Sequence, residues 1–339
     1  MTAAASDPSP VPTDAPPGVD AATRTALAAE VVASIESPRS PRRIVRRLLH
    51  NPASLLGTVL LVGFAAIALA APILAPCPDD ARTGRRCRDS VYLVPKFGFS
   101  KEPQPPSAEH RFGTTTDQYD IYYGVVWGTR TAFIVGIVIT TLALLIGLTV
   151  GSISAYYGGW VDEILMRIVE VFQAFPFLLA AITLATILRS LPQVQGVLPA
   201  MLALVAFGWT GYARLIRADI LSVKQREYVW AARSVGASDF RIITRHVLPN
   251  AIFPVLVLAS LNIGTIVLSF AALSFFGLGV PDGYADWGQM IASARQRVPS
   301  LVSDWYIVVF PGLAITLFSL AWNLIGDAFR DILDPRLAR

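Results

Sequence analysis

Six stretches of this chain run for 18 residues or more without a charged side chain, and the charged residues lie in blocks between them. A helix needs about 20 apolar residues to cross the roughly 30 Å hydrocarbon core of a bilayer. A charge near its middle costs at least about 2.5 kcal/mol, so uncharged runs of this length are informative. The runs are 53–75, 131–161, 171–188, 190–213, 247–281 and 305–326.

Composition agrees with these runs, since only 15% of the residues are charged, whereas a soluble domain carries about 25%. The sequence therefore predicts an all-α polytopic membrane protein with six transmembrane helices. Several runs exceed the length of one span, so the exact helix ends are not fixed at this stage.

Lys and Arg gather before the first run, between the fourth and fifth, and after the last. Cytoplasmic loops are enriched in these residues, which predicts cytoplasmic N- and C-termini. The intervening 76–125 loop has seven basic and seven acidic residues, but long loops cross membranes largely regardless of charge. The predicted parts are a disordered, basic cytoplasmic tail (1–52), a first transmembrane helix (53–75), an extracytoplasmic loop (76–125), a core with five transmembrane helices (126–328) that includes a cytoplasmic loop (214–249), and a cytoplasmic C-terminus (329–339).

The two cysteines, Cys77 and Cys87, both fall in the predicted outer loop. An oxidising compartment favours a disulfide between them, and two free thiols are the alternative. Two cysteines and three histidines are too few for a multi-cysteine metal site, so we expect no metal. None of the three lysines follows a glycine, which excludes a P-loop. We therefore expect no catalytic residue in this chain.

The most informative segment lies between the fourth and fifth runs, where residues 227–250 read EYVWAARSVGASDFRIITRHVLPN. This pattern predicts a short helix, a break at Gly236, and a second helix that Ser238 caps and that stops at Pro249. The small residues Ala231 and Ala232 leave a shallow face that suits a partner's groove. An ordinary amphipathic helix at the membrane interface is the alternative.

This segment resembles the EAA loop of binding-protein-dependent ABC importer permeases. The family pattern has an Ala-Ala pair, then a glycine after three residues, and an aliphatic-Leu-Pro ending. It is matched by Ala231, Ala232, Gly236, Val247, Leu248 and Pro249. Trp230 stands where the motif has Glu, and Glu227 one turn earlier could supply the acidic group. The resemblance implies that this loop docks on an ATPase through Glu227, Ala231, Ala232, Gly236, Ser238, Leu248 and Pro249.

Further motifs resemble the dipeptide, oligopeptide and nickel branch of that family, over roughly residues 40 to 335. They are His110–Thr114 with Asp117, Asp120, Gly128 and Arg130; Gly151 with Tyr156–Gly159, Asp162, Met166, Arg167, Phe175 and Pro176; and Leu273–Gly279 with Trp287 and Gly288. The second-permease, or C-type, subunit of a peptide importer is the closest match. The fold implied is therefore that of a type I importer permease.

The resemblance also implies partners. These are a second homologous permease, two cytoplasmic ABC ATPase subunits, an extracytoplasmic substrate-binding protein, a peptide substrate and membrane lipid, but no nucleic acid. ATP and Mg would be bound by the partner subunits, with no cofactor on this chain, which is then not itself an enzyme. The chain would span the plasma (inner) membrane of a prokaryote several times.

Four polar residues inside the runs are candidates to line a translocation path. Asn262, Thr265 and Ser269 share one helical face, and Gln173 is a similar candidate in the third run. The alternative is that they bond at helix contacts or back to their own helix. Other solutes, such as nickel, remain possible substrates. A stand-alone secondary transporter is the rival function, although it would need intramembrane ionisable groups that no run clearly supplies.

Overall fold

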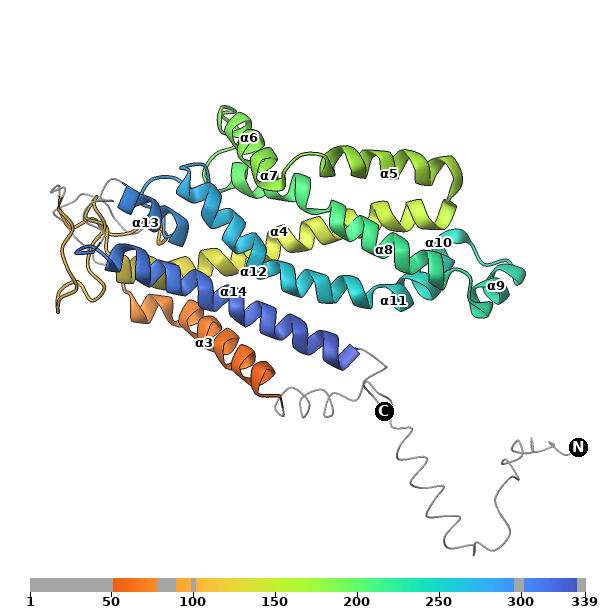
Figure 1. Ribbon diagram of the computed structural model, residues 1–339, viewed down its shortest axis with the longest axis horizontal. Helices are drawn as coiled ribbons and strands as arrows, with labels where there is room; N and C mark the ends of the chain where they lie inside the picture. Colours follow the sequence, from red (N-terminus) through yellow and green to blue (C-terminus); the bar gives the residue numbers. More distant parts are fainter. Residues whose placement is uncertain (1–50, 78–89, 99–101, 296–301, 334–339) are drawn as a thin grey trace, which may run out of the picture. The chain divides into compact units, whose positions relative to one another are not determined.

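The computed structural model describes residues 51–77, 90–98, 102–295 and 302–333, and this part of the chain is mostly helical (Figure 1). Within these residues, β-structure is limited to three isolated bridges, Leu93–Tyr284, Lys96–Tyr119 and Thr114–Asp120. The elements are α3 (Pro52–Leu74), α4 (Ile121–Tyr157), α5 (Gly159–Gln173), α6 (Phe177–Arg189), α7 (Leu198–Gly208), α8 (Thr210–Val223), α9 (Glu227–Ser234), α10 (Asp239–Ile242), η1 (Ile243–Val247), α11 (Leu248–Ala251), α12 (Phe253–Phe275), α13 (Trp287–Ser293) and α14 (Tyr306–Leu333).

Five helical stretches are long and apolar enough to cross a membrane. They are Pro52–Leu74, Ile121–Tyr157, Leu198–Val223, Phe253–Phe275 and Tyr306–Asp331. A sixth crossing exists if α5 and α6 count as one span, and this pair is bent by 86°. The prediction of an all-α membrane protein is confirmed, but its third span is not one straight helix. Pro176 at the bend explains the break, because proline cannot donate the backbone hydrogen bond that a continuing helix needs.

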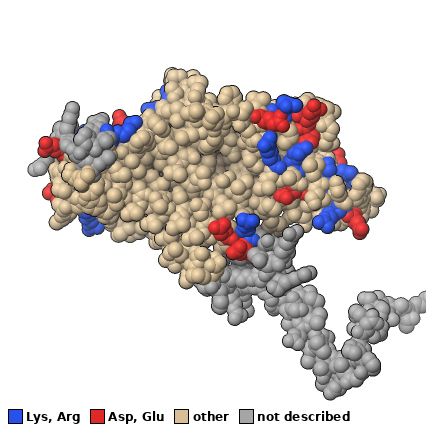
Figure 2. Space-filling view, in the orientation of Figure 1, with Lys and Arg blue, Asp and Glu red and all other residues tan. Residues whose placement is uncertain are grey.

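Side-chain exposure fits a lipid environment around these helices. In α3, Val62, Leu69 and Ile73 are 62%, 78% and 83% exposed, a pattern that water would penalise and hydrocarbon would not. Figure 2 shows charged side chains gathered toward the ends of the helical region, with a wide uncharged belt between them. This is the charge distribution that the six uncharged runs predicted.

Helix α4 packs closely against α8 because glycines bring the two backbones together. A Cβ at Gly147 would lie 2.5 Å from Cβ of Tyr212, and one at Gly151 would lie 2.3 Å from the Ala213 carbonyl oxygen. Small residues at a spacing of four allow this approach in membrane helices. Tyr212 and Ile216 of α8 are consequently buried in a core formed by α4, α8 and the segment between α8 and α12.

Helix α14 packs between α12 and α3. Gly264 of α12 lies against Ser319, whose hydroxyl donates to the Gly264 carbonyl at 3.2 Å. Phe318 of α14, which is fully buried, meets Phe64 of α3 at a ring distance of 5.4 Å and Trp287 of α13 at 5.8 Å. These contacts join the first and last spans to the same core.

A non-helical assembly, residues 90–98 and 102–120, lies at the end of the bundle that carries α13 (Figure 1). The Trp127 indole donates to the Ala75 carbonyl at 3.0 Å, and Asp120 caps α4 by accepting from the Tyr123 amide at 2.7 Å. Asp286 caps α13 in the same way, and burial raises its pKa to about 6.

Cys77 borders this assembly, whereas Cys87 lies outside the described residues, as does nearly all of the predicted 1–52 tail. The Cys77–Cys87 disulfide therefore stays a prediction.

The close approach of α4 and α8 predicts that Gly151→Ala destabilises the fold. The new methyl group would overlap backbone atoms of α8, and overpacking of this kind costs about 1–3 kcal/mol. The melting temperature of the purified protein should fall by several degrees. Gly211→Ala in α8 is the matched control, because its Cβ would meet nothing within 4 Å. Equal melting temperatures for the two variants would contradict the packing argument.

Candidate functional site

The coupling segment, residues 227–252, connects α8 to α12 and projects from one end of the helical region (Figure 1). It consists of α9, a tight turn at 235–238, and the helical series α10, η1 and α11. Glu227 lies in the first turn of α9 and Arg233 in the last. These positions suit an acid and a base, because the amino end of a helix attracts negative charge and the carboxyl end positive charge.

Gly236 ends α9 in a Schellman motif. Its φ of +80° lies in the left-handed region, which favours glycine. The Gly236 amide donates to the Arg233 carbonyl at 2.9 Å, and the Ala237 amide donates to the Ala232 carbonyl at 3.2 Å. Both bonds belong to this motif, which satisfies carbonyls that the helix end would leave unpaired. A Cβ here would meet nothing within 4 Å, so the glycine is needed for its conformation and not for space.

Two local predictions about the second helix are corrected by the structure. Ser238 occupies the cap position of α10, but its side chain makes no capping hydrogen bond. The helix also does not stop at Pro249. It widens into a π-helical turn at Ile243–Val247, in which the Leu248 amide reaches the Ile243 carbonyl. Pro249 follows directly after this wider turn, and the Asn250 side-chain amide donates to the His246 carbonyl at 2.7 Å.

The predicted docking residues separate into an exposed face and a buried one. Glu227, Ala231, Gly236, Ser238 and Pro249 are exposed, Leu248 is half-buried, and Ala232 is 9% exposed within the core. Ala232 is thus a packing residue, in contrast to its exposed neighbour Ala231.

Four large apolar side chains of this segment are exposed, and only Trp230 among them was singled out from the sequence. They are Tyr228, Trp230, Val235 and Phe240, which are 43%, 57%, 83% and 77% exposed. Large exposed apolar side chains concentrated on one short segment mark a candidate protein interaction site.

The segment and the preceding helix α8 are anchored to the junction of α4 and α5 by contacts that sequence spacing does not indicate. The Tyr156 hydroxyl donates to a carboxylate oxygen of Asp239 at 2.6 Å. Lys224 donates to the Ala155 carbonyl at 2.6 Å, and Arg217 makes two hydrogen bonds with Asp162, at 2.5 and 2.6 Å. Groups more than 50 residues apart are involved, so only the folded chain brings them together.

Two of the four predicted path residues use their polar groups in hydrogen bonds within or between helices. Asn262 donates to the Tyr212 hydroxyl of α8 at 3.0 Å, and the Ser269 hydroxyl bonds the Thr265 carbonyl of its own helix at 2.9 Å. Thr265 is exposed and Ser269 half-buried, and Gln173 is exposed at the end of α5. The bonds of Asn262 and Ser269 match the alternative anticipated for them, and the path role stays a prediction.

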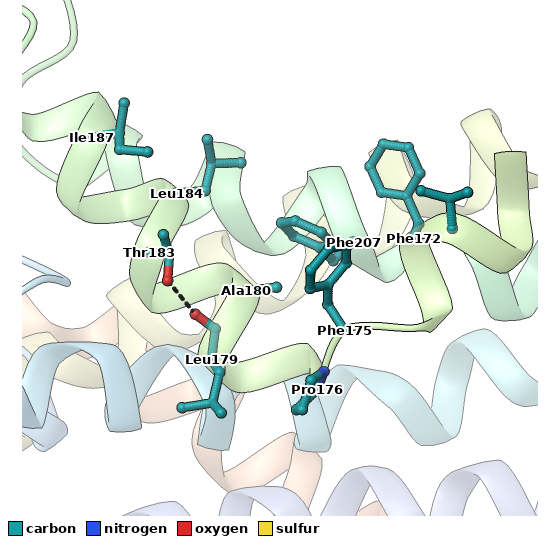
Figure 3. Close-up of a pocket in the computed structure, with 10 residues that line it drawn as sticks. Phe172, Phe175, Pro176, Leu179, Ala180, Thr183, Leu184, Ile187 and Phe207 are labelled. Atoms are coloured by element: carbon teal, nitrogen blue, oxygen red, sulfur yellow. Dashed lines mark hydrogen bonds between the residues drawn. The ribbon is translucent and has the colours of Figure 1, made fainter.

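An apolar groove of about 550 Å³ lies at the bend between α5 and α6. Figure 3 shows Phe172, Phe175 and Phe207 gathered beside Pro176, while the Thr183 hydroxyl bonds the Leu179 carbonyl of its own helix. The groove therefore presents rings and aliphatic carbons and holds no group suited to acid–base or metal chemistry. No cluster of three or more metal-ligating side chains is found among the described residues.

Comparison with known proteins identifies the family. Residues 143–339 match the family of binding-protein-dependent transport system inner membrane components, and residues 40–90 match the N-terminal transmembrane domain of oligopeptide transport permease C. The chain belongs to this permease family. The family resemblance predicted from the sequence is thereby confirmed, and the protein is a membrane-spanning permease subunit of an importer.

Similar curated proteins extend over most of this permease. It is 36% identical to the dipeptide transport system permease of Alkalihalophilus pseudofirmus over 296 residues, which are 87% of this chain and 90% of that one. It is 33% identical to the oligopeptide transport system permease of Bacillus subtilis, over 86% of this chain and 88% of that one. It is 38% identical to the glutathione transport system permease of Pectobacterium atrosepticum, over 73% and 81%.

A solved structure has the same fold. It is an inward-facing conformation of the MetNI methionine ABC transporter, with a TM-score of 0.50 and 20% identity, covering 62% of this permease and 97% of that chain. The importer-permease fold that the sequence predicted is therefore confirmed by structure as well as by family.

The Schellman motif predicts the effect of changes at Gly236. A Cβ in the left-handed conformation costs roughly 1–2 kcal/mol, so in Gly236→Ala the Ala237 amide should exchange its hydrogen about tenfold faster. Gly236→Asn should stay close to wild type, since asparagine tolerates this position. Hydrogen–deuterium exchange of a peptide covering the turn measures both. Unchanged protection in Gly236→Ala would contradict this account of the turn.

Proposed function

We propose that this permease forms half of the translocation path of an ATP-driven peptide importer and receives its driving force through the coupling segment. The observation that carries the proposal is that four large apolar side chains are exposed on one short segment, whose turn and anchoring contacts are described above. Its curated relatives are permeases of dipeptide, oligopeptide and glutathione transport systems, which supports a peptide substrate. Uptake of nickel or another small solute is the alternative within the family.

In this proposal, the coupling segment faces the cytoplasm and docks in a cleft of an ABC ATPase. The exposed rings of Trp230 and Phe240 would enter apolar pockets there, and Ala231 would let the surfaces approach closely. The Arg233 guanidinium lies over the Trp230 ring at 5.7 Å, a cation–π contact that orients the indole. Trp230 thus gives an aromatic contact where the family motif has an acid, and Glu227 lies one turn away.

The path itself would lie between this chain and a second permease. Non-helical backbone at membrane depth is tolerated only when protein covers it or when it lines a water-filled cavity. The bend at 174–176 and the exposed Gln173 therefore favour a protein or aqueous neighbour over lipid. A substrate-binding protein would deliver the peptide to the opposite end, and the ATPases would bind ATP and Mg.

Purification from the native host tests this composition. The tagged permease, extracted gently from the plasma membrane, should bring with it a second permease and P-loop ATPases. Reconstituted with its binding protein, the complex should take up peptides only when ATP is supplied on the coupling side. Recovery of the chain alone, with uptake driven by an ion gradient, would favour the secondary transporter. Uptake of nickel in place of peptide would move the substrate to the alternative.

A charge at the docking surface should separate the ATPases from the membrane part. Ala231→Arg places a long cation on the exposed face of α9, where it would obstruct the proposed cleft. The second permease should still co-purify, and the ATPases should not. Ser222→Arg is the matched control, since Ser222 is exposed on α8 outside the coupling segment. Retention of the ATPases in the Ala231 variant would place the docking surface elsewhere.

Trp230 should contribute strongly to this docking. Truncating an aromatic residue that is central to an interface costs about 2 kcal/mol or more, which weakens binding about 30-fold. Titration of the ATPase onto the reconstituted permeases should detect this in Trp230→Ala. Trp160→Ala changes a tryptophan that is 73% exposed on α5 and should bind as wild type does. Equal affinities for the two variants would remove Trp230 from the interface.

A further inference from the structure

The end of α4 and the start of α5 form a corner, residues 154–162, whose shape is set by two glycines. Gly158 and Gly159 have φ values of +68° and +56°, and a Cβ at either would meet nothing within 4 Å. Their left-handed conformation ends one helix and turns the chain into the next. Any displacement of this corner therefore acts on both α4 and α5, and α5 leads directly to the 86° bend.

Helix α8 holds one side of the corner through two basic side chains. Arg217 binds Asp162 with both nitrogens of its fork, and the Ser154 hydroxyl donates to the same carboxylate. Lys224 donates to the Ala155 carbonyl at 2.6 Å. Bidentate and charge-assisted bonds are among the stronger polar contacts in proteins. This side of the corner is consequently tied to α8, the helix from which the coupling segment emerges.

The coupling segment holds the other side through Tyr156, the penultimate residue of α4. The Tyr156 hydroxyl donates to Asp239 of α10 at 2.6 Å, and the Arg233 guanidinium of α9 lies over its ring at 5.3 Å. Tyr156 is 6% exposed. One side chain of α4 thus contacts both helical parts of the coupling segment, one through its hydroxyl and the other through its ring.

We propose that Tyr156 is the positioning residue that transmits movement of the coupling segment to α4 and α5. The inference rests on the proposed function and names the contact through which docking acts on the membrane helices. A hydrogen bond to a carboxylate is directional, so Asp239 constrains where the end of α4 lies relative to α10. The Arg233 contact keeps the phenol ring in the orientation that this bond requires. Without the hydroxyl, the two elements could move independently.

The test is Tyr156→Phe in the complete reconstituted importer, with peptide uptake and ATP hydrolysis measured together. The ring and its cation–π contact with Arg233 remain, while the hydroxyl and its bond to Asp239 are lost. We expect assembly to be unchanged and ATP hydrolysis to proceed at or above the wild-type rate. The number of peptides transported per ATP should fall about tenfold, a factor that corresponds to about 1.4 kcal/mol. Tyr157→Phe is the matched control, because this neighbouring phenol is 56% exposed, and it should transport as wild type does.

A double-mutant cycle separates this role from a merely structural one. If Tyr156 and Asp239 act through one contact, Asp239→Ala should reduce the transport ratio as Tyr156→Phe does, and combining them should add little. Asp331→Ala, at an exposed acid near the end of α14, should leave the ratio unchanged. A wild-type ratio in Tyr156→Phe, additive effects in the cycle, or loss of assembly in both single variants would overturn the inference. Failure of wild-type uptake to require ATP would instead refute the proposed function.

Discussion

Backbone amides and carbonyls that lie in hydrocarbon must find hydrogen-bond partners within the protein, since water is absent there. The candidate spans of this permease answer that constraint with helices, and the sharp 86° bend at 174–176 lies beside aromatic rings that form a groove. The break exposes backbone that lipid cannot satisfy. The need to cover it is a physical reason for a permease of this design to function next to another protein surface.

Helix α4 connects the two ends of the molecule because it is longer than a bilayer is thick. Its 37 residues extend about 55 Å at 1.5 Å per residue, compared with a hydrocarbon core of about 30 Å. Its N-terminal cap is Asp120, within the non-helical assembly at one end of the bundle, and its last turn contains Tyr156. Close packing through Gly147 and Gly151 fixes the position of α4 against α8, the helix that precedes the coupling segment.

Much of this architecture follows from the sequence, because uncharged runs and charge blocks have one simple solution in a membrane. The helix class was predictable in this way. The family was predictable from the motif resemblance around Ala231, Ala232 and Gly236, and the break at 236 from the glycine itself. A proline at 176 is sufficient to expect an interrupted helix, but it does not specify the 86° angle of the bend. The π-helical turn before Pro249 was not predictable, since proline usually signals an end and here the helix widens instead.

The candidate site was predictable in position but not in its contacts. Ala231 and Ala232 are adjacent and identical in chemistry, yet one is exposed and the other buried, because only one faces the core that contains Val229 and Ile242. The bond between Tyr156 and Asp239 joins residues 83 positions apart, and nothing in either local pattern points to the other. Side-chain pairs of this kind come from the tertiary fold.

The coupling segment is joined to the membrane helices by two routes of different character. One is the backbone, which stays helical from Asp239 through η1 and α11 into α12, with hydrogen bonds such as that from Ile252 to Leu248 bridging the junctions. The other consists of side chains, through which Arg233 and Asp239 hold Tyr156. In the proposed mechanism, the backbone route would act on α12 and the side-chain route on α4 and α5. Because α4 packs on both α8 and α12, the two routes end in one connected core.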